Sequence, residues 1–194
     1  MNDSKIIVNT TDSSILSKET EVSSSFENQS VDITDLENNI IDSIVFNLKD
    51  IIKDNKGRGK YPKQDIFYLS FIPPISLYDY IKEIMEQTKM NISTLIISII
   101  YIDRFCHKNK YILTLNNIYR ILLSTILLSI KFNQDNIISN KTYSKIAHVF
   151  IEDLNTLEFQ MYLKLHFSLK VNEELYHNYY DYFSNFSNKK APKL

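Results

Sequence analysis

The sequence predicts an all-α fold, and three observations lead to that prediction. Apolar residues recur at intervals of three and four along most of the chain, and no segment shows the alternation of a half-buried strand. Only two glycines and four prolines occur in the 194 residues, which disfavours an all-β fold with its many tight turns. Finally, the stretch 118–132, IYRILLSTILLSIKF, is apolar on every side of a helical wheel, and such a helix must be surrounded by lipid or by other helices.

The second of these environments, a helical domain, fits the length of the apolar stretch. Its uncharged part lies between Arg120 and Lys131 and is about half of the roughly 20 residues that a membrane span requires. We therefore expect 118–132 to be the central helix of a soluble helical domain, with Thr114 as its cap. Lys131 should lie where this helix leaves the core.

A polar segment and one helix are expected before that domain. Residues 1–33 are rich in Ser, Thr, Asn and acidic residues without a continuous apolar face, which is typical of a disordered tail. The spacing of Thr34 and Glu37 is that of a capping box, and it predicts a helix whose apolar stripe continues to about Asp54. A basic loop follows, and we interpret it as a solvated turn in preference to an import signal. Residues 34–65 thus form an N-terminal helix and a loop.

The next segments lead into the helical domain. Residues 61–75 form an aromatic-rich connector whose apolar side chains are expected to lie across the domain. Ser76 is a suitable cap for a helix over residues 77–89. Either Asn91 or Ser93 opens the following helix, which contains the apolar sequence STLIISIIYIDRF.

The remaining helices follow the central one. After a polar loop, a short helix over residues 141–150 precedes a longer one over about 152–165. The segment 167–186 is aromatic and acidic, and about half of it is expected to be helical. The sequence thus predicts five helices within residues 76–167, with one more helix in front.

Composition and motifs disfavour an enzyme. Lys and Arg total 22 against 23 for Asp and Glu, so a nucleic-acid surface spread over the whole protein is not expected. Neither a Gly-rich phosphate loop, an HExxH motif nor a Cys/His ligand set occurs, and the four histidines are dispersed. Asp103 is the one acid expected inside a core helix, and no catalytic constellation can be assembled around it. We expect no catalytic residues, no metal and no cofactor.

The single cysteine and the N-terminus bear on the compartment. Cys106 lies in an apolar helical run, where a buried and inert thiol is expected, and a lone cysteine fits a reducing compartment. The N-terminus lacks the basic start and the apolar stretch of a signal peptide. We therefore expect the protein to be located in the cytoplasm, the nucleus or both, without membrane association.

Five segments, in chain order, resemble the cyclin box. Residues 73–76, PPIS, are similar to the entry of the P/U-type cyclins, and 100–105, IYIDRF, are similar to the YIDRF or YLDRF stretch of cyclins. The central helix ends in LSIKF at 128–132, which resembles their A/S-x-KF ending. LNTLE at 154–158 and LHFSL at 165–169 resemble the LNxLE…LxFxL pattern of the P/U type, a single-box group typified by the phosphate-pathway cyclin of yeast.

This resemblance covers roughly residues 66–183. It implies a single five-helix cyclin box, assigned to residues 66–186, with an additional N-terminal helix before it and a short tail, 187–194, after it. The pathway stays open between cell-cycle control and phosphate signalling.

The resemblance also implies a function and a binding site. The chain would be the regulatory subunit of a cyclin-dependent protein kinase, forming a heterodimer that positions the kinase αC helix and activation loop. Lys131 and Glu158 would hold the backbone of that helix through charge-assisted hydrogen bonds. Apolar side chains beside them would form its bed; the alternative is that these side chains simply complete the core. The implied partner-binding residues are Lys131, Phe132, Asp135, Glu158, Tyr162, Phe167 and Leu169.

Two other points stay open. Asp103 and Arg104 are expected to be structural, but Lys82 and Glu83 stand where relatives commonly carry an arginine, so the partner of Asp103 is undetermined. The alternatives to a kinase subunit are a kinase-independent adaptor of cyclin fold in transcription and a purely structural helical module. A DNA-binding adaptor would need a basic groove, which none of the predicted box helices supplies.

Overall fold

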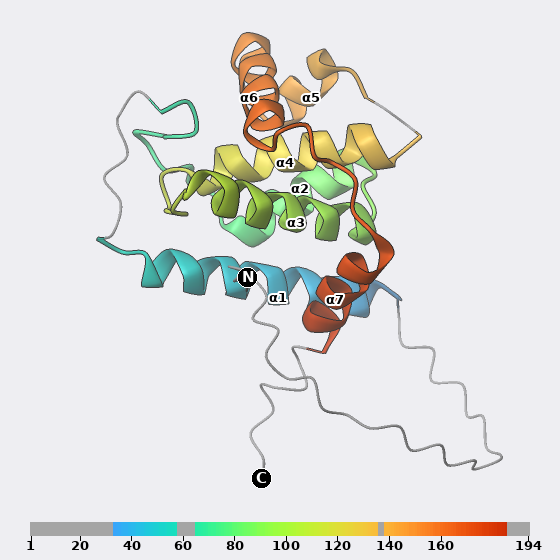
Figure 1. The fold of residues 1–194 in the computed structure, drawn as a ribbon. Helices are drawn as coiled ribbons and strands as arrows, with labels where there is room; N and C mark the ends of the chain where they lie inside the picture. The colour runs from blue at the N-terminus through green and yellow to red at the C-terminus, as the bar shows by residue number, and fades with distance from the viewer. Residues whose placement is uncertain (1–32, 58–64, 136–137, 186–194) are drawn as a thin grey trace, which may run out of the picture.

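A computed structural model describes residues 33–57, 65–135 and 138–185 of the chain. Within these residues the chain forms seven α-helices and no strand, which confirms the all-α prediction (Figure 1). The helices are α1 (Ile33–Asp54), α2 (Leu77–Thr88), α3 (Ile92–Asn109), α4 (Ile118–Asn133), α5 (Asn140–Ile146), α6 (Ile151–Lys164) and α7 (Glu173–Ser184). The predicted tails, apart from Ile33, and the second half of the basic loop, residues 58–60, lie outside the described residues.

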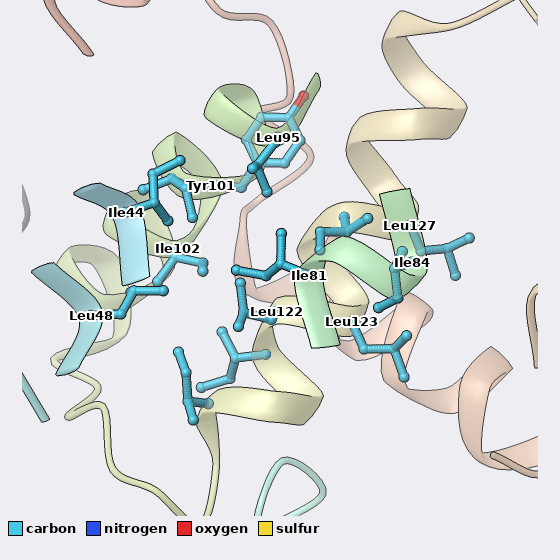
Figure 2. Close-up of a cluster of buried hydrophobic side chains, with 14 of the residues drawn as sticks. Ile44, Leu48, Ile81, Ile84, Leu95, Tyr101, Ile102, Leu122, Leu123 and Leu127 are labelled. Carbon is cyan, nitrogen blue, oxygen red and sulfur yellow. The ribbon is translucent and has the colours of Figure 1, made fainter. Parts of the chain in front are cut away.

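Helix α4 is the centre of the fold. From Ile118 to Ile130 every side chain except that of Arg120 is buried, as its apolar composition on all sides predicted. It packs between α3 and α6, while α2 and α5 pack against each other beside it (Figure 1). Figure 2 shows Ile81 of α2 pointing into the same apolar cluster as Leu122 and Leu123 of α4.

Helix α1 is part of this core. The buried members of its stripe are Ile40, Ile41, Ile44, Val45, Leu48 and Ile52. Ile44 and Leu48 lie at the edge of the cluster that contains Ile102 of α3 (Figure 2). The helix runs below α2, α3 and α4 in Figure 1 and contacts α2 and α7. None of the helices in the described residues is long and apolar enough to cross a membrane.

Two predicted caps, Ser76 and Asn91, are confirmed. Such caps can be predicted because they depend only on neighbouring residues. Ser76 Oγ accepts a hydrogen bond from the amide of Asp79 at 3.1 Å, and α2 begins at the next residue. Asn91 Oδ1 accepts from the amide of Thr94 at 2.8 Å at the start of α3. Each bond satisfies one of the amides that a helix start leaves unpaired.

Two other predicted caps are wrong. Helix α1 begins at Ile33, so Thr34 lies within its first turn and is not its cap. Helix α4 begins at Ile118, as expected for the stretch 118–132, but its cap position is Asn117 and not Thr114. Asn117 Oδ1 accepts from the amide of Thr114 at 2.8 Å, and the carbonyl of Thr114 accepts from the amide of Ile118 at 3.0 Å. A separate turn therefore precedes α4.

The short helix predicted over 141–150 is α5, and it ends earlier. His148 has a φ of 52°, in the left-handed region, and the amide of Val149 donates back to the carbonyl of Ser144 at 3.0 Å. The helix stops at Ile146 as a result.

The connector is also only partly as expected. Phe67 is buried, but Phe71 is 70% exposed and Ile72 is exposed as well. The expectation that the connector's apolar side chains all lie across the domain is therefore wrong.

Candidate functional site

A charged pair joins the last turn of α4 to the middle of α6. Lys131 Nζ lies 2.6 Å from Glu158 Oε1, and the two side chains are 29% and 18% exposed. The two residues are 27 positions apart in the sequence, and they meet because α4 packs directly against α6. The pair lies at the edge of the core, where water still reaches both groups.

The pair forms one side of a hollow between the two helices, which we call the α4–α6 hollow. Its volume is about 300 Å³. Leu128 and Leu169 are buried members of its wall, whereas the rings of Phe132 and Phe159 are 54% and 58% exposed. The complete lining is Leu128, Lys131, Phe132, Asn155, Glu158, Phe159, Tyr162 and Leu169. The hollow thus combines apolar walls with one ion pair and one amide.

A tight turn after α6 presents another phenylalanine beside the hollow. His166 and Phe167 have φ values of 53° and 59°, a conformation that side-chain-bearing residues rarely adopt. The ring of Phe167 is 59% exposed and meets the edge of the Tyr162 ring at a centroid distance of 4.7 Å. The turn therefore extends the apolar surface from Tyr162 outward.

Side-chain donors from α3 hold this turn. Arg104 Nη1 donates to the carbonyl of Ser168 at 3.0 Å. Further back along the chain, Lys108 Nζ reaches the carbonyl of Leu165 at 3.2 Å and Asn109 Nδ2 that of Lys164 at 3.0 Å. The bonds from Lys108 and Asn109 join the end of α6 to α3, and the bond from Arg104 holds the turn after α6, which gives Arg104 a structural role.

The structure brings most of the predicted binding residues together. Lys131, Glu158 and Tyr162 line the α4–α6 hollow together with Phe132 and Leu169. Leu169 is buried and completes the core, whereas the exposed rings of Phe132 and Phe167 do not. The alternative reading, in which these apolar residues only complete the core, therefore holds for Leu169 but not for the two phenylalanines. Their part in binding a partner stays a prediction.

Asp135 is the exception among the predicted residues. It is exposed and does not line the α4–α6 hollow. It lines a separate polar hollow, beside Lys89 and Asn91 at the turn between α2 and α3. Its expected contact with a partner also stays a prediction.

Sequence reasoning missed three residues at the site. Phe159 and Asn155 line the hollow, and their spacing from Glu158 and Tyr162 places all four on one face of α6. This helical spacing was a usable signal. Asn140, the first residue of α5, donates from Nδ2 to Glu158 Oε2 at 2.7 Å, and its distance along the chain gave no such signal.

The acid Asp103 lies away from this hollow, in the seam between α3 and α7. It is 7% exposed, and Tyr179 Oη of α7 donates to its Oδ2 at 2.6 Å. Burial, and then the neighbouring charge of Asp103, raise the pKa of Tyr179 above its ordinary value of 10.0. The partner that the sequence left undetermined is thus a tyrosine 76 residues further along the chain.

The described residues offer little for catalysis. Cys106 is buried, as expected, and burial raises the pKa of its thiol, so a thiolate nucleophile is disfavoured there. No group of three or more His, Cys, Asp or Glu side chains with metal-binding geometry occurs in the parts of the chain that the structure covers.

Comparisons with a family model and with known proteins all point to the same family. The family model described as Cyclin matches residues 2–169. Cyclin-U2-1 of Arabidopsis thaliana is 30% identical over 126 residues, which are 64% of this chain and 57% of that protein. Cyclin-U2-2 of the same plant is 32% identical over 122 residues, 62% of this chain and 53% of its own length. Cyclin-P3-1 of Oryza sativa subsp. japonica is 24% identical over 139 residues, 72% of this chain and 58% of its own length. The chain thus spans somewhat more than half the length of these relatives.

Proposed function

The chain belongs to the cyclin family, as a cyclin of the P/U type, and we propose that it is the regulatory subunit that binds and activates a cyclin-dependent protein kinase. Family membership supports a regulatory role without an active site in this chain. The proposal adds the partner, a kinase catalytic subunit in a heterodimer, and the surface that binds it.

The observation that carries the proposal is the α4–α6 hollow with its surroundings. The exposed rings of Phe132, Phe159 and Phe167 lie in or beside a hollow whose rim holds the Lys131–Glu158 pair. Exposed aromatic groups gathered around a concavity are typical of protein-binding surfaces, where such rings act as anchors. A charged pair at the rim adds directional hydrogen bonds to that apolar contact.

The geometry suggests how a kinase helix would be held. An ammonium group has three donors, and Lys131 uses one of them for Glu158, so two remain for backbone carbonyls of a partner. The Glu158 carboxylate has further lone pairs for backbone amides of the partner. The apolar face of the kinase αC helix would lie against the phenylalanines.

Activation follows from preference for one kinase conformation. In an active kinase the αC glutamate meets the lysine of strand β3, and the activation loop is ordered. A regulatory subunit shifts the kinase toward this state only if it binds this state more tightly than the inactive one. In this proposal the α4–α6 hollow provides that difference by binding αC in its inward position.

The test is co-purification from a cell extract. The tagged full chain should retain a protein kinase that phosphorylates a generic Ser/Thr substrate peptide. Phe159→Asp, which places a charge in the hollow, should lose the kinase while the protein stays folded. Phe71→Asp is the matched control, because Phe71 is also an exposed phenylalanine but lies in the connector, outside the α4–α6 hollow.

Two outcomes would contradict the proposal. A folded wild-type chain that retains no kinase would favour the alternatives, an adaptor in transcription or a structural helical module. Loss of the kinase in Phe71→Asp and not in Phe159→Asp would place the binding surface elsewhere on the molecule.

A further inference from the structure

Asn140 makes the contact between α5 and the charged pair. It follows Ser139, the cap of α5, whose Oγ accepts from the amide of Thr142 at 3.2 Å. Its Nδ2 lies 2.7 Å from Glu158 Oε2 and 2.7 Å from Asn155 Oδ1. One side-chain amide thus bridges two residues of α6 that belong to the lining of the α4–α6 hollow.

The two carboxylate oxygens of Glu158 therefore have different partners. Oε1 pairs with Lys131 of α4, and Oε2 accepts from Asn140 of α5. The orientation of the Asn140 amide is fixed as well. Turning it over would place its Oδ1 against Glu158 Oε2, so that two acceptor oxygens would face each other.

We propose that Asn140 is a positioning residue for the kinase-binding surface: it fixes the Glu158 carboxylate, and through it Lys131, in the arrangement that receives the kinase backbone. The inference rests on the proposed function and deepens it. Asn140 is not among the residues that line the hollow, so it acts through Glu158 and not by contact with the partner.

The physical reason is preorganisation. Glutamate and lysine are long side chains that lose much rotamer freedom when a partner immobilises them. A contact that already fixes Glu158 in the free chain removes part of this cost from the binding step. Asn140 supplies such a contact from a helix that does not belong to the hollow itself.

Folding depends on Asn140 much less. Tyr143 is fully buried and anchors α5 in the core, and α5 packs against both α2 and α6. Asn140 is only partly buried, and its contacts to Asn155 and Glu158 lie at the surface edge of α6. Its removal should therefore change binding and leave the fold in place.

The experiment compares Asn140→Ala and Asn140→Asp in the full chain. The probe is the kinase catalytic subunit that the wild-type chain retains, titrated to give Kd and kinase activity at saturation. Asn140→Ala should weaken affinity roughly 3- to 10-fold, the cost of immobilising about one side chain. Asn140→Asp should weaken it further, since it sets a second carboxylate against Glu158.

Both variants should reach wild-type activity at saturation and melt within a few degrees of wild type. Asn39→Asp, at an exposed position on α1, is the matched control and should change nothing.

A double-mutant cycle separates positioning from a general structural role. In a Glu158→Ala background, Asn140→Ala should cause no further loss of affinity, because the group that it positions is absent. Full additivity, unchanged affinity or tighter binding in Asn140→Ala would overturn the inference while leaving the proposed function intact. If the wild-type chain retains no kinase, the proposed function and the inference fail together.

Discussion

Two polar contacts of equal length lie in different surroundings in this protein. Tyr179 Oη and Asp103 Oδ2 are 2.6 Å apart in the seam between α3 and α7, where both side chains are buried. Lys131 Nζ and Glu158 Oε1 are also 2.6 Å apart, but at the edge of a hollow that is open to a partner. Distance alone therefore does not indicate what a polar contact contributes.

Burial determines the difference. Removing one partner of a buried contact leaves the other group without its hydrogen bond, and this costs about 1–3 kcal/mol of stability. An exposed ion pair contributes about 0–1 kcal/mol, because water solvates both groups when the pair separates. The seam contact should thus matter for folding, and the rim pair for what binds to the hollow.

The largest effect should come from the apolar core itself, at the buried stripe of α1. Ile44→Asp combined with Leu48→Asp places two carboxylates at fully buried positions, and burying unpaired charges costs several kcal/mol each. We expect insoluble or unfolded protein, measured by soluble yield and circular dichroism. Lys49→Asp, at an exposed position of the same helix, should stay soluble. A soluble and folded double variant would show that this stripe is not part of the core.

The seam contact itself should give the next largest effect. Asp103→Ala leaves the buried hydroxyl of Tyr179 without this acceptor, and Tyr179→Phe removes one donor from Asp103. Each should lower the free energy of unfolding by about 1–3 kcal/mol, measured by urea denaturation. Kinase retention per folded molecule should not change in either variant. If either variant is as stable as wild type, the Asp103–Tyr179 contact does not contribute to folding in the way that distinguishes it from the Lys131–Glu158 pair.

The same contact should make stability depend on alkaline pH. Burial and Asp103 raise the pKa of Tyr179 in the folded chain, whereas the unfolded chain has the ordinary value of 10.0. Above that pH the folded state holds a proton that the unfolded state has lost, so stability is complete below about pH 10 and falls as the pH rises. The slope from one such group approaches about 1.4 kcal/mol per pH unit. Tyr179→Phe should reduce the slope above pH 10 by that amount, while other buried tyrosines with a raised pKa, such as Tyr80 and Tyr143, keep the rest of the slope. An unchanged slope would contradict the assignment.

Local features were predictable from the sequence. The apolar character of α4 on all sides predicted its burial, and the caps Ser76 and Asn91 depend on residues three positions away. The same reasoning failed where a residue took an unusual backbone conformation. His148 ends α5 with a positive φ that glycine would normally adopt, and the sequence has no glycine there to indicate it.

Contacts between distant segments were not predictable in the same way. The tyrosine that partners Asp103 lies 76 residues away, and Asn140 lies 18 residues from Glu158 on another helix. The spacing of residues along one helix carries no information about such pairs. Lys131 and Glu158 were identified through the resemblance to cyclins, and the structure then placed them in contact. The fold was thus readable from patterns, whereas the surroundings of the site depend on tertiary packing.

The smallest effect on folding, and the clearest on function, is expected at the rim. Lys131→Ala and Glu158→Ala should each change the free energy of unfolding by less than about 1 kcal/mol, because the pair stays partly hydrated. In a complex the same groups would be dried, and truncating one of them costs roughly 2–5 kcal/mol of binding. That is about 30-fold or more in affinity. Both variants should therefore fold normally and fail to activate the kinase at concentrations where the wild-type chain does.

The controls for this prediction have to be charges without a structural contact. Lys108 is unsuitable, because its Nζ donates to the carbonyl of Leu165 and helps to hold the turn that presents Phe167. Lys49→Ala on α1 and Glu174→Ala on α7 remove exposed charges that do not line the hollow, and they should change neither stability nor kinase activation. If Lys131→Ala and Glu158→Ala activate the kinase like wild type, the rim pair is a surface contact of little consequence. If they unfold the protein, the pair belongs with Asp103 and Tyr179, and the distinction between seam and rim is wrong.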